Sequence, residues 1–136
     1  MILHFTIPGV PVPWKRAQQK GKQFFTDPRV RAFKEAVAWS AKHAGARVTE
    51  RPCTLAITCY MPIAASWSKN KRLEASADVL RHTSKPDWDN LGKGISDALN
   101  GVAWIDDSQV VYASVRKLYS ENPRTDVTVQ WLCGNP

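Results

Sequence analysis

The strongest constraint on the fold is a short stretch, residues 53–61, in which apolar and less apolar side chains alternate without interruption. Leu55, Ile57 and Cys59 share one side of this stretch, and the alternation stops at Pro62. Such a pattern is typical of a β-strand that buries one face, so it requires neighbouring strands and a covering layer. We therefore expect a sheet with residues 53–61 near its centre.

Hydrophobic periodicity elsewhere predicts further short elements. Residues 2–7 alternate like a strand, and residues 28–44 carry apolar side chains at helical spacing. A second helix is predicted over about 89–100, and residues 109–118 and 126–132 are predicted to form an antiparallel pair of strands. The order β-α-β-(α)-α-β-β indicates a mixed α/β fold of the α+β class, a small mixed sheet with helices packed mainly on one face.

Two polar segments lie outside this pattern. Residues 8–27 contain three prolines and a run of basic side chains, which predicts a long loop. Residues 67–80 are basic and lack a wide apolar stripe, so they indicate a weak helix or ordered loop outside the core. A chain of 136 residues has the usual size of one folding unit, so we expect residues 1–136 to form a single domain.

The sequence shows no sign of export or of a membrane segment. No run approaches the ~18 to 20 apolar residues that span a bilayer, and prolines interrupt the N-terminal region. The odd number of cysteines (Cys53, Cys59 and Cys133) and the absence of a CxxC motif favour buried, reduced thiols. We therefore expect a cytoplasmic protein with no membrane partner.

Charge is distributed very unevenly along the chain. The formal net charge is +7, yet residues 87–107 contain five aspartates and a single lysine, which leaves +11 on the rest. A basic body favours a polyanionic partner such as a nucleic acid. The acidic segment is either a solvated helix face or a divalent-cation site that faces this partner.

The spacing of the aspartates is informative. Asp87 and Asp89 stand one residue apart just before the second predicted helix, and Asp107 follows after the helix and its return. If the three carboxylates meet, their mutual repulsion requires protons or cations. Oxygen ligands without histidine or cysteine favour Mg²⁺ or Mn²⁺ over Zn²⁺. Lys93 shares a helical face with Asp89, either in a surface ion-pair ladder or beside a bound phosphate.

Two glycines inside the second predicted helix also need an explanation. Gly92 and Gly94 each weaken a helix by roughly 1 kcal/mol relative to alanine. Their presence is therefore expected to reflect the close approach of another part of the backbone.

The full acidic string, KPDWDNLGKGISDALNGVAWIDDSQVV, covers about a fifth of the chain. It resembles the signature of the RusA-type Holliday-junction resolvases, which are small phage and prophage endonucleases. The resemblance lies in Asp87-x-Asp89-Asn90-Leu91, in Lys93, in the Asp97-Ala98-Leu99 segment and in Asp106-Asp107 before a strand. Residues 63–83 form an insertion that resembles a longer, phage-type branch.

This resemblance implies a homodimer that makes paired nicks in four-way DNA junctions with Mg²⁺, or with Mn²⁺ in its place. It assigns Asp87, Asp89 and Asp107 to the metal and makes Lys93 the essential lysine. Asp106 has a less certain role. Asp97 either supports the metal ligands or forms an ion pair with Lys93, and the ion pair is favoured. The implied biological setting is recombination and repair in a bacterial host.

Basic side chains in both polar segments are candidates for DNA contact. The candidates are Lys15, Arg16, Lys20, Lys22, Lys69, Lys71, Arg72, Arg81 and Lys85. Phe24 and Phe25 either stack on unpaired bases or cap the core. Trp88 and Trp104 are expected to be core or dimer anchors.

Two functions of different classes remain at this point. One is a metal-dependent, structure-selective DNA endonuclease, and the other is a non-catalytic DNA-binding protein whose aspartates only organise a loop. Both predict binding that weakens with salt, because both neutralise phosphates. Only the first predicts nicking of a four-way junction.

Overall fold

A computed structural model describes residues 1–134, and its centre is a four-stranded mixed sheet. The strands are β1 (Ile2–Pro8), β4 (Cys53–Pro62), β5 (Val110–Ser120) and β6 (Arg124–Trp131). Their spatial order is β1-β6-β4-β5, with β6 antiparallel to both neighbours and β4 parallel to β5. The predicted α+β class and the interior position of residues 53–61 are both confirmed.

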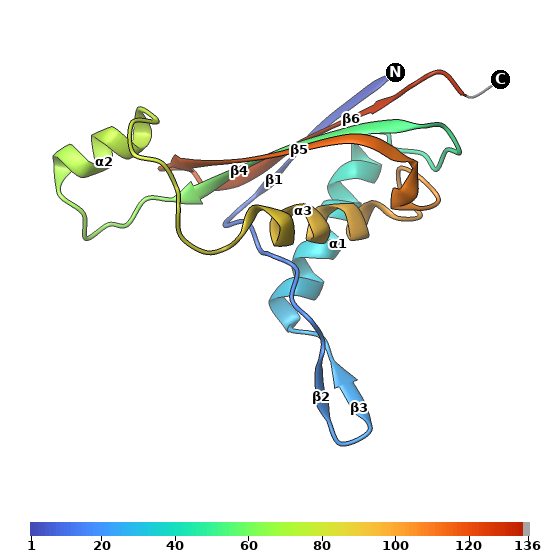
Figure 1. Ribbon diagram of the computed structural model, residues 1–136, viewed down its shortest axis with the longest axis horizontal. Coiled ribbons are helices and arrows are strands. Elements are labelled where there is room, and N and C mark those ends of the chain that lie inside the picture. Colours follow the sequence, from blue (N-terminus) through green and yellow to red (C-terminus); the bar gives the residue numbers. More distant parts are fainter. Residues whose placement is uncertain (135–136) are drawn as a thin grey trace.

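Helices α1 (Pro28–His43) and α3 (Trp88–Leu99) lie beneath the same face of this sheet (Figure 1). The alternation in β4 explains the arrangement, because Leu55, Ile57 and Cys59 are buried toward the helices. Helix α1 contributes Val37 to the same core at full burial. The two layers therefore bury one apolar face of the sheet, as the sequence predicts.

The predicted pairing of the last two strands is wrong. Strands β5 and β6 follow each other in sequence, but β4 lies between them and pairs with both. Residues 121–123 cross the end of β4, where the chain leaves the sheet at Pro62. Alternation along a strand indicates which face is buried but not which strand is its neighbour, and the apolar β4 needs partners on both edges.

The sequence predicts that the basic segment 8–27 is a long loop, but part of this segment is a hairpin. Strands β2 (Gln18–Lys20) and β3 (Gln23–Phe25) form a small antiparallel hairpin that projects away from the helices, on the side opposite the sheet (Figure 1). Gly21 has φ +63° in the two-residue turn, a conformation that hairpin turns of this length require. Phe24 and Phe25 are exposed, so they do not cap the core.

The second polar segment forms α2 (Lys69–Ser76), which lies beyond one end of the sheet (Figure 1). Ser68 caps this helix by accepting a hydrogen bond from the Lys71 amide at 3.2 Å. The helix buries only Ala75, which agrees with the expected position outside the core. Within residues 1–134, no helix combines the length and apolarity needed to traverse a membrane.

The three cysteines are free thiols in two different environments. Cys53 and Cys59 are buried in the core, as expected, and burial raises the pKa of the Cys59 thiol to about 12. Cys133 is exposed, so the expectation of burial fails for this residue. It follows β6, where the chain has already left the sheet.

Candidate active site

The start of α3 carries an aspartate that does not cap its helix. Asp87 occupies the N-cap position, yet its side chain accepts no hydrogen bond from the helix amides. Instead, the Lys85 ammonium donates to Asp87 Oδ2 at 2.8 Å, and this contact raises the pKa of Lys85. An N-cap aspartate ordinarily stabilises its helix through that missing bond. A ligand of the Asp87 carboxylate therefore competes with an exposed lysine and not with the helix amides.

A groove between α3 and β5 collects side chains from distant parts of the sequence. It has a volume of about 330 Å³, and Asp89, Lys93 and Asp107 all line it. Leu55 and Ile57 of β4 are also in its wall. Trp88 stands at the same groove with 63% of its surface exposed, so it does not belong to the core, and the alternative expectation of a dimer anchor stays a prediction. The groove thus presents two carboxylates and an ammonium on an apolar wall.

Asp107 is placed by a short 3-10 helix, η1 (Asp107–Gln109), between the return loop and β5. Asp106 caps η1 by accepting a hydrogen bond from the Ser108 amide, and hydrogen bonds from the Ser108 side chain and amide lower the pKa of Asp106. The Gln109 amide group donates to the carbonyls of Thr49 and Arg51 at 2.7 and 3.0 Å. Asp106 is therefore a local structural residue, and its neighbour Asp107 faces the groove.

Lys93 is held from two sides. Its ammonium lies 3.9 Å from Asp97 Oδ2, which confirms the favoured ion pair, and 4.9 Å from the centre of the Trp14 ring. The Trp14 amide donates to the Asn90 carbonyl at 2.8 Å and so holds the proline-rich segment against α3. The ring and the carboxylate together restrict where the Lys93 charge can lie.

The helical glycines allow this tight packing, as expected. A Cβ atom on Gly94 would lie 3.3 Å from the Trp14 backbone nitrogen, and one on Gly92 would lie 3.0 Å from Val115 Cγ2. Close approach of another backbone therefore accounts for Gly94. At Gly92 the close neighbour is a side chain of β5 instead. Helix α3 is thus packed closely between residues 12–14 and the edge strand.

The three predicted metal ligands are not gathered into one cluster. Asp87 lines a neighbouring cavity of about 530 Å³ with His82 and Asn90, whereas Asp89 and Asp107 share the groove. Helix α3 begins at the aspartate pair, and η1 lies beyond its other end (Figure 1). Among residues 1–134, no three His, Cys, Asp or Glu side chains stand close enough together to hold a metal ion. The carboxylate donors suit Mg²⁺ or Mn²⁺, but a three-aspartate site is not preformed.

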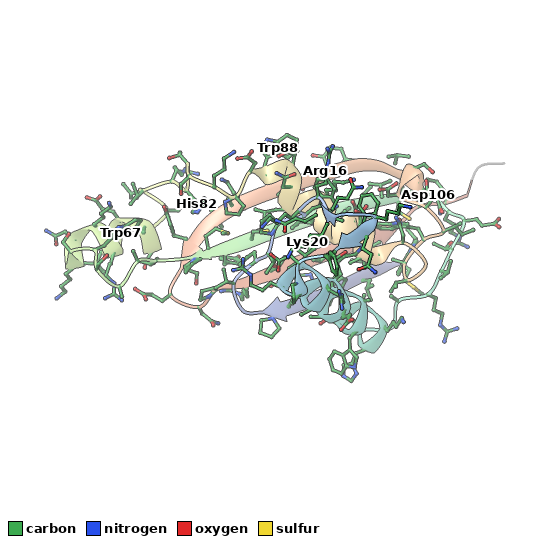
Figure 2. All side chains as sticks on the ribbon, turned by 90° about the horizontal axis from the view of Figure 1, so that it is seen from below. Arg16, Lys20, Trp67, His82, Trp88 and Asp106 are labelled. Carbon is green, nitrogen blue, oxygen red and sulfur yellow. The ribbon has the colours of Figure 1, made fainter. Side chains whose placement is uncertain are left out.

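The nine candidate DNA-contact residues lie in three segments: Lys15, Arg16, Lys20 and Lys22 in the hairpin segment, Lys69, Lys71 and Arg72 on α2, and Arg81 and Lys85 in the loop before α3. Arg16 and Lys20 belong to the segment with the projecting hairpin, and Trp67 marks the distant α2 end of the molecule (Figure 2). Along the molecule, Trp88 lies between His82 on one side and Asp106 on the other. The candidate site therefore lies along the helix side of the protein, with basic segments on two sides.

Several of these candidates already contact carboxylates of their own chain. Arg72 makes a forked pair with Glu121 at 3.0 and 3.1 Å, and Arg81 lies 3.2 Å from Asp78. Lys71 instead lies over the Trp67 ring, 4.0 Å from its centre. Several basic side chains on the α2 side are thus held by contacts within the chain, which the sequence alone does not indicate.

One residue of the site region was missed by sequence reasoning. Lys117 points to the helix side of β5 and donates to the carbonyls of Ser84 and Pro86, both at 3.0 Å. The available signal was a lysine on the strand face that Val115 also occupies. Its partners lie some thirty residues earlier in the chain, and no local pattern indicates such a contact.

Comparison with known proteins agrees with the family that the sequence motif resembles. The family model described as "Endodeoxyribonuclease RusA" matches residues 8–130. The chain is also 39% identical over 135 residues to "Uncharacterized protein YqaN" of Bacillus subtilis (strain 168), and the match covers 94% of this chain and 95% of that relative. The family match spans the hairpin, α2 and the whole groove. The chain therefore belongs to the RusA family of endodeoxyribonucleases, the Holliday-junction resolvases.

Proposed function

We propose that this endonuclease resolves four-way DNA junctions by paired, symmetric nicks and that it depends on Mg²⁺, with Mn²⁺ as a substitute. RusA-family nucleases are generally dependent on a divalent metal, which supports the coarser part of this proposal. The setting we propose is recombination and repair in a bacterial host, with the protein encoded by a phage or prophage.

The observation that supports the proposal is the groove, which Asp89 and Lys93 of an α-helix and Asp107 of a 3-10 helix all line. We assign Asp87, Asp89 and Asp107 to the cation. Because Asp87 lines a separate cavity, its ligation requires its side chain to leave Lys85 and the start of α3 and η1 to draw together around the ion. The exposed ion pair with Lys85 opposes the first of these movements only weakly. When bound, the cation activates water and stabilises the departing oxygen of a phosphodiester.

Other residues of this chain bind the DNA and limit water in the groove. Lys93, held by Asp97 and Trp14, binds the scissile phosphate and neutralises developing negative charge. The apolar wall formed by Leu55 and Ile57 limits water on one side of the groove. We also propose that the basic hairpin segment and the α2 region bind the phosphates of two junction arms.

Two cuts of equal geometry require two copies of the site. A protomer of this size has an expected radius of gyration of only ~14 Å, and the groove occurs once in it. A two-fold dimer has the symmetry of a four-way junction, so a homodimer presents one groove to each of two strands. This reasoning supports the proposed dimer.

The experiment that tests the function uses a synthetic four-way junction with Mg²⁺, on which wild type is expected to leave two symmetric nicks. Asp89→Asn is expected to bind the junction with little change and to cut it at least 10²-fold more slowly. Asp126→Asn is the matched control, because Asp126 lies in β6 and bonds Thr6 at 2.7 Å. Binding without cleavage by wild type, or equal cleavage by all three proteins, contradicts the proposal.

A further inference from the structure

Lys117 occupies a position in β5 where an apolar side chain is expected. It pairs in register with the buried Cys59, so both side chains point toward the helices. Val115 and Tyr119, on the same face of β5, are partly buried and pack on the core. A lysine at such a position loses part of its hydration and needs compensating contacts.

The compensation comes from the loop before α3. The Lys117 ammonium donates to the Ser84 and Pro86 carbonyls at 3.0 Å each. Within residues 1–134 it forms no ion pair, so these carbonyl dipoles are its identified partners. A charged donor makes stronger hydrogen bonds than a neutral one, which makes this a firm connection between β5 and the loop.

The loop has few other fixed points. In the described chain, residues 81–86 make no backbone-to-backbone hydrogen bonds, whereas Asp87 begins the bonded turns of α3. The Pro86 carbonyl directly precedes the Asp87 amide. The Asp87 side chain does not cap the helix, so apart from the exposed ion pair with Lys85 its direction depends on the backbone that Lys117 holds.

We propose that Lys117 is a positioning residue of the nuclease: its ammonium fixes the Ser84 and Pro86 carbonyls and thereby directs the Asp87 carboxylate toward the cation. The inference rests on the proposed function, because it requires Asp87 to bind the cation. Lys117 itself touches neither the cation nor the DNA in this scheme. It acts through the loop, as residues that orient metal ligands do.

The test compares Lys117→Met with Arg116→Met on the full chain. Arg116 is the adjacent basic residue of the same strand, is exposed, and pairs with Thr58 on the opposite face of the sheet. The two substitutions therefore remove the same charge, but only the first removes the loop contacts. Three quantities are measured for each protein: junction affinity in EDTA, the Mg²⁺ concentration for half-maximal cleavage, and Mn²⁺ binding by electron paramagnetic resonance.

Lys117→Met is expected to raise the half-saturating Mg²⁺ concentration and the Mn²⁺ dissociation constant by about tenfold or more, the usual effect of losing a contact that orients a ligand. Junction affinity in EDTA and the cleavage rate at saturating metal are expected to change by less than about threefold. Arg116→Met is expected to leave the metal dependence unchanged. Lys117→Arg, which keeps the charge and the donors, is expected to restore most of the metal affinity.

The outcomes separate this inference from the function on which it rests. If wild type cuts the junction and both methionine variants share its metal dependence, Lys117 has no positioning role. If wild type does not cut, the proposed function fails first. Should Lys117→Met melt below the assay temperature, Lys117→Gln takes its place with the same expected shift, and an unchanged metal affinity in that variant overturns the inference.

Discussion

The starts of α1 and α3 are built from the same residue type and behave differently. Each helix has an aspartate at its N-cap with a lysine nearby: Lys15 lies 3.7 Å from Asp27, and Lys85 lies 2.8 Å from Asp87. Asp27 accepts a hydrogen bond from the Arg29 amide at 2.9 Å, whereas Asp87 accepts none from its helix. One aspartate stabilises a helix, and the other makes no bond to its helix and pairs only with an exposed lysine at the edge of the candidate site.

This difference shows how a functional carboxylate can be recognised in the fold. Capping by aspartate is favourable because the side chain satisfies an otherwise unpaired amide near a positive helix end. A carboxylate that forgoes this bond gives up stability at its own helix. Such a local loss is common where a residue is retained for activity. The comparison therefore predicts that Asp27 matters for stability and Asp87 for activity.

The largest expected difference between the two aspartates is in catalysis. Asp87→Asn is expected to reduce junction cleavage by about 10³-fold, because the loss of a charged ligand removes several kcal/mol of transition-state stabilisation. Asp27→Asn is expected to cut at the wild-type rate, since asparagine also caps helices well. Single-turnover cleavage of a labelled junction with saturating Mg²⁺ measures both. Equal losses of cleavage rate in the two variants contradict the prediction that Asp87, and not Asp27, serves activity.

The next expected difference is in thermal stability, where substitution of Asp27 is expected to have a larger effect than substitution of Asp87. Asp27→Ala removes the cap of α1 and is expected to lower the melting temperature by about 4 °C. Asp87→Ala removes no cap, so its melting temperature is expected to stay within about 2 °C of wild type. Circular dichroism melts in EDTA measure both changes. A larger loss for Asp87→Ala than for Asp27→Ala contradicts the assignment of Asp87 as a carboxylate that does not stabilise its helix.

Sequence patterns predict the layers of this fold well and its strand order poorly. The alternation of β4 and the helical spacing of α1 each record which face of one element is buried, and that information is local in the sequence. The neighbours of β5 depend instead on how the chain crosses the end of β4, which involves residues 121–123. The hairpin was missed because its residues are exposed and lack an apolar face, although Gly21 marks its turn.

The site was predictable in composition but not in geometry. The string from Lys85 to Val111 indicates which residues belong to the family motif. It cannot show that Asp106 caps η1 while Asp107 faces the groove, because the two residues are identical and adjacent. Nor does it show that Asp87 lines a separate cavity or that Lys117 holds the preceding loop. These features depend on tertiary contacts between segments far apart in the sequence.

The smallest expected difference is in the pH dependence of stability, and it concerns the α1 start alone. The hydrogen bond from the Arg29 amide lowers the pKa of Asp27 below its ordinary value of 3.8. The folded chain therefore remains ionised at a pH where the unfolded chain already binds a proton, and stability rises with pH across that interval. The contribution is complete above about pH 3.8 and disappears as the pH falls through the folded-state pKa.

Asp27→Ser tests whether the Asp27 charge causes this pH dependence, because serine caps a helix without titrating. The free energy of unfolding of wild type minus that of Asp27→Ser is expected to decrease steadily as the pH falls below 3.8 and to be constant near neutrality. Urea titrations between about pH 2.5 and pH 6 measure the difference. A difference that is independent of pH means that the Asp27 charge adds nothing to its cap, and the contrast with Asp87 then rests on hydrogen-bond geometry alone.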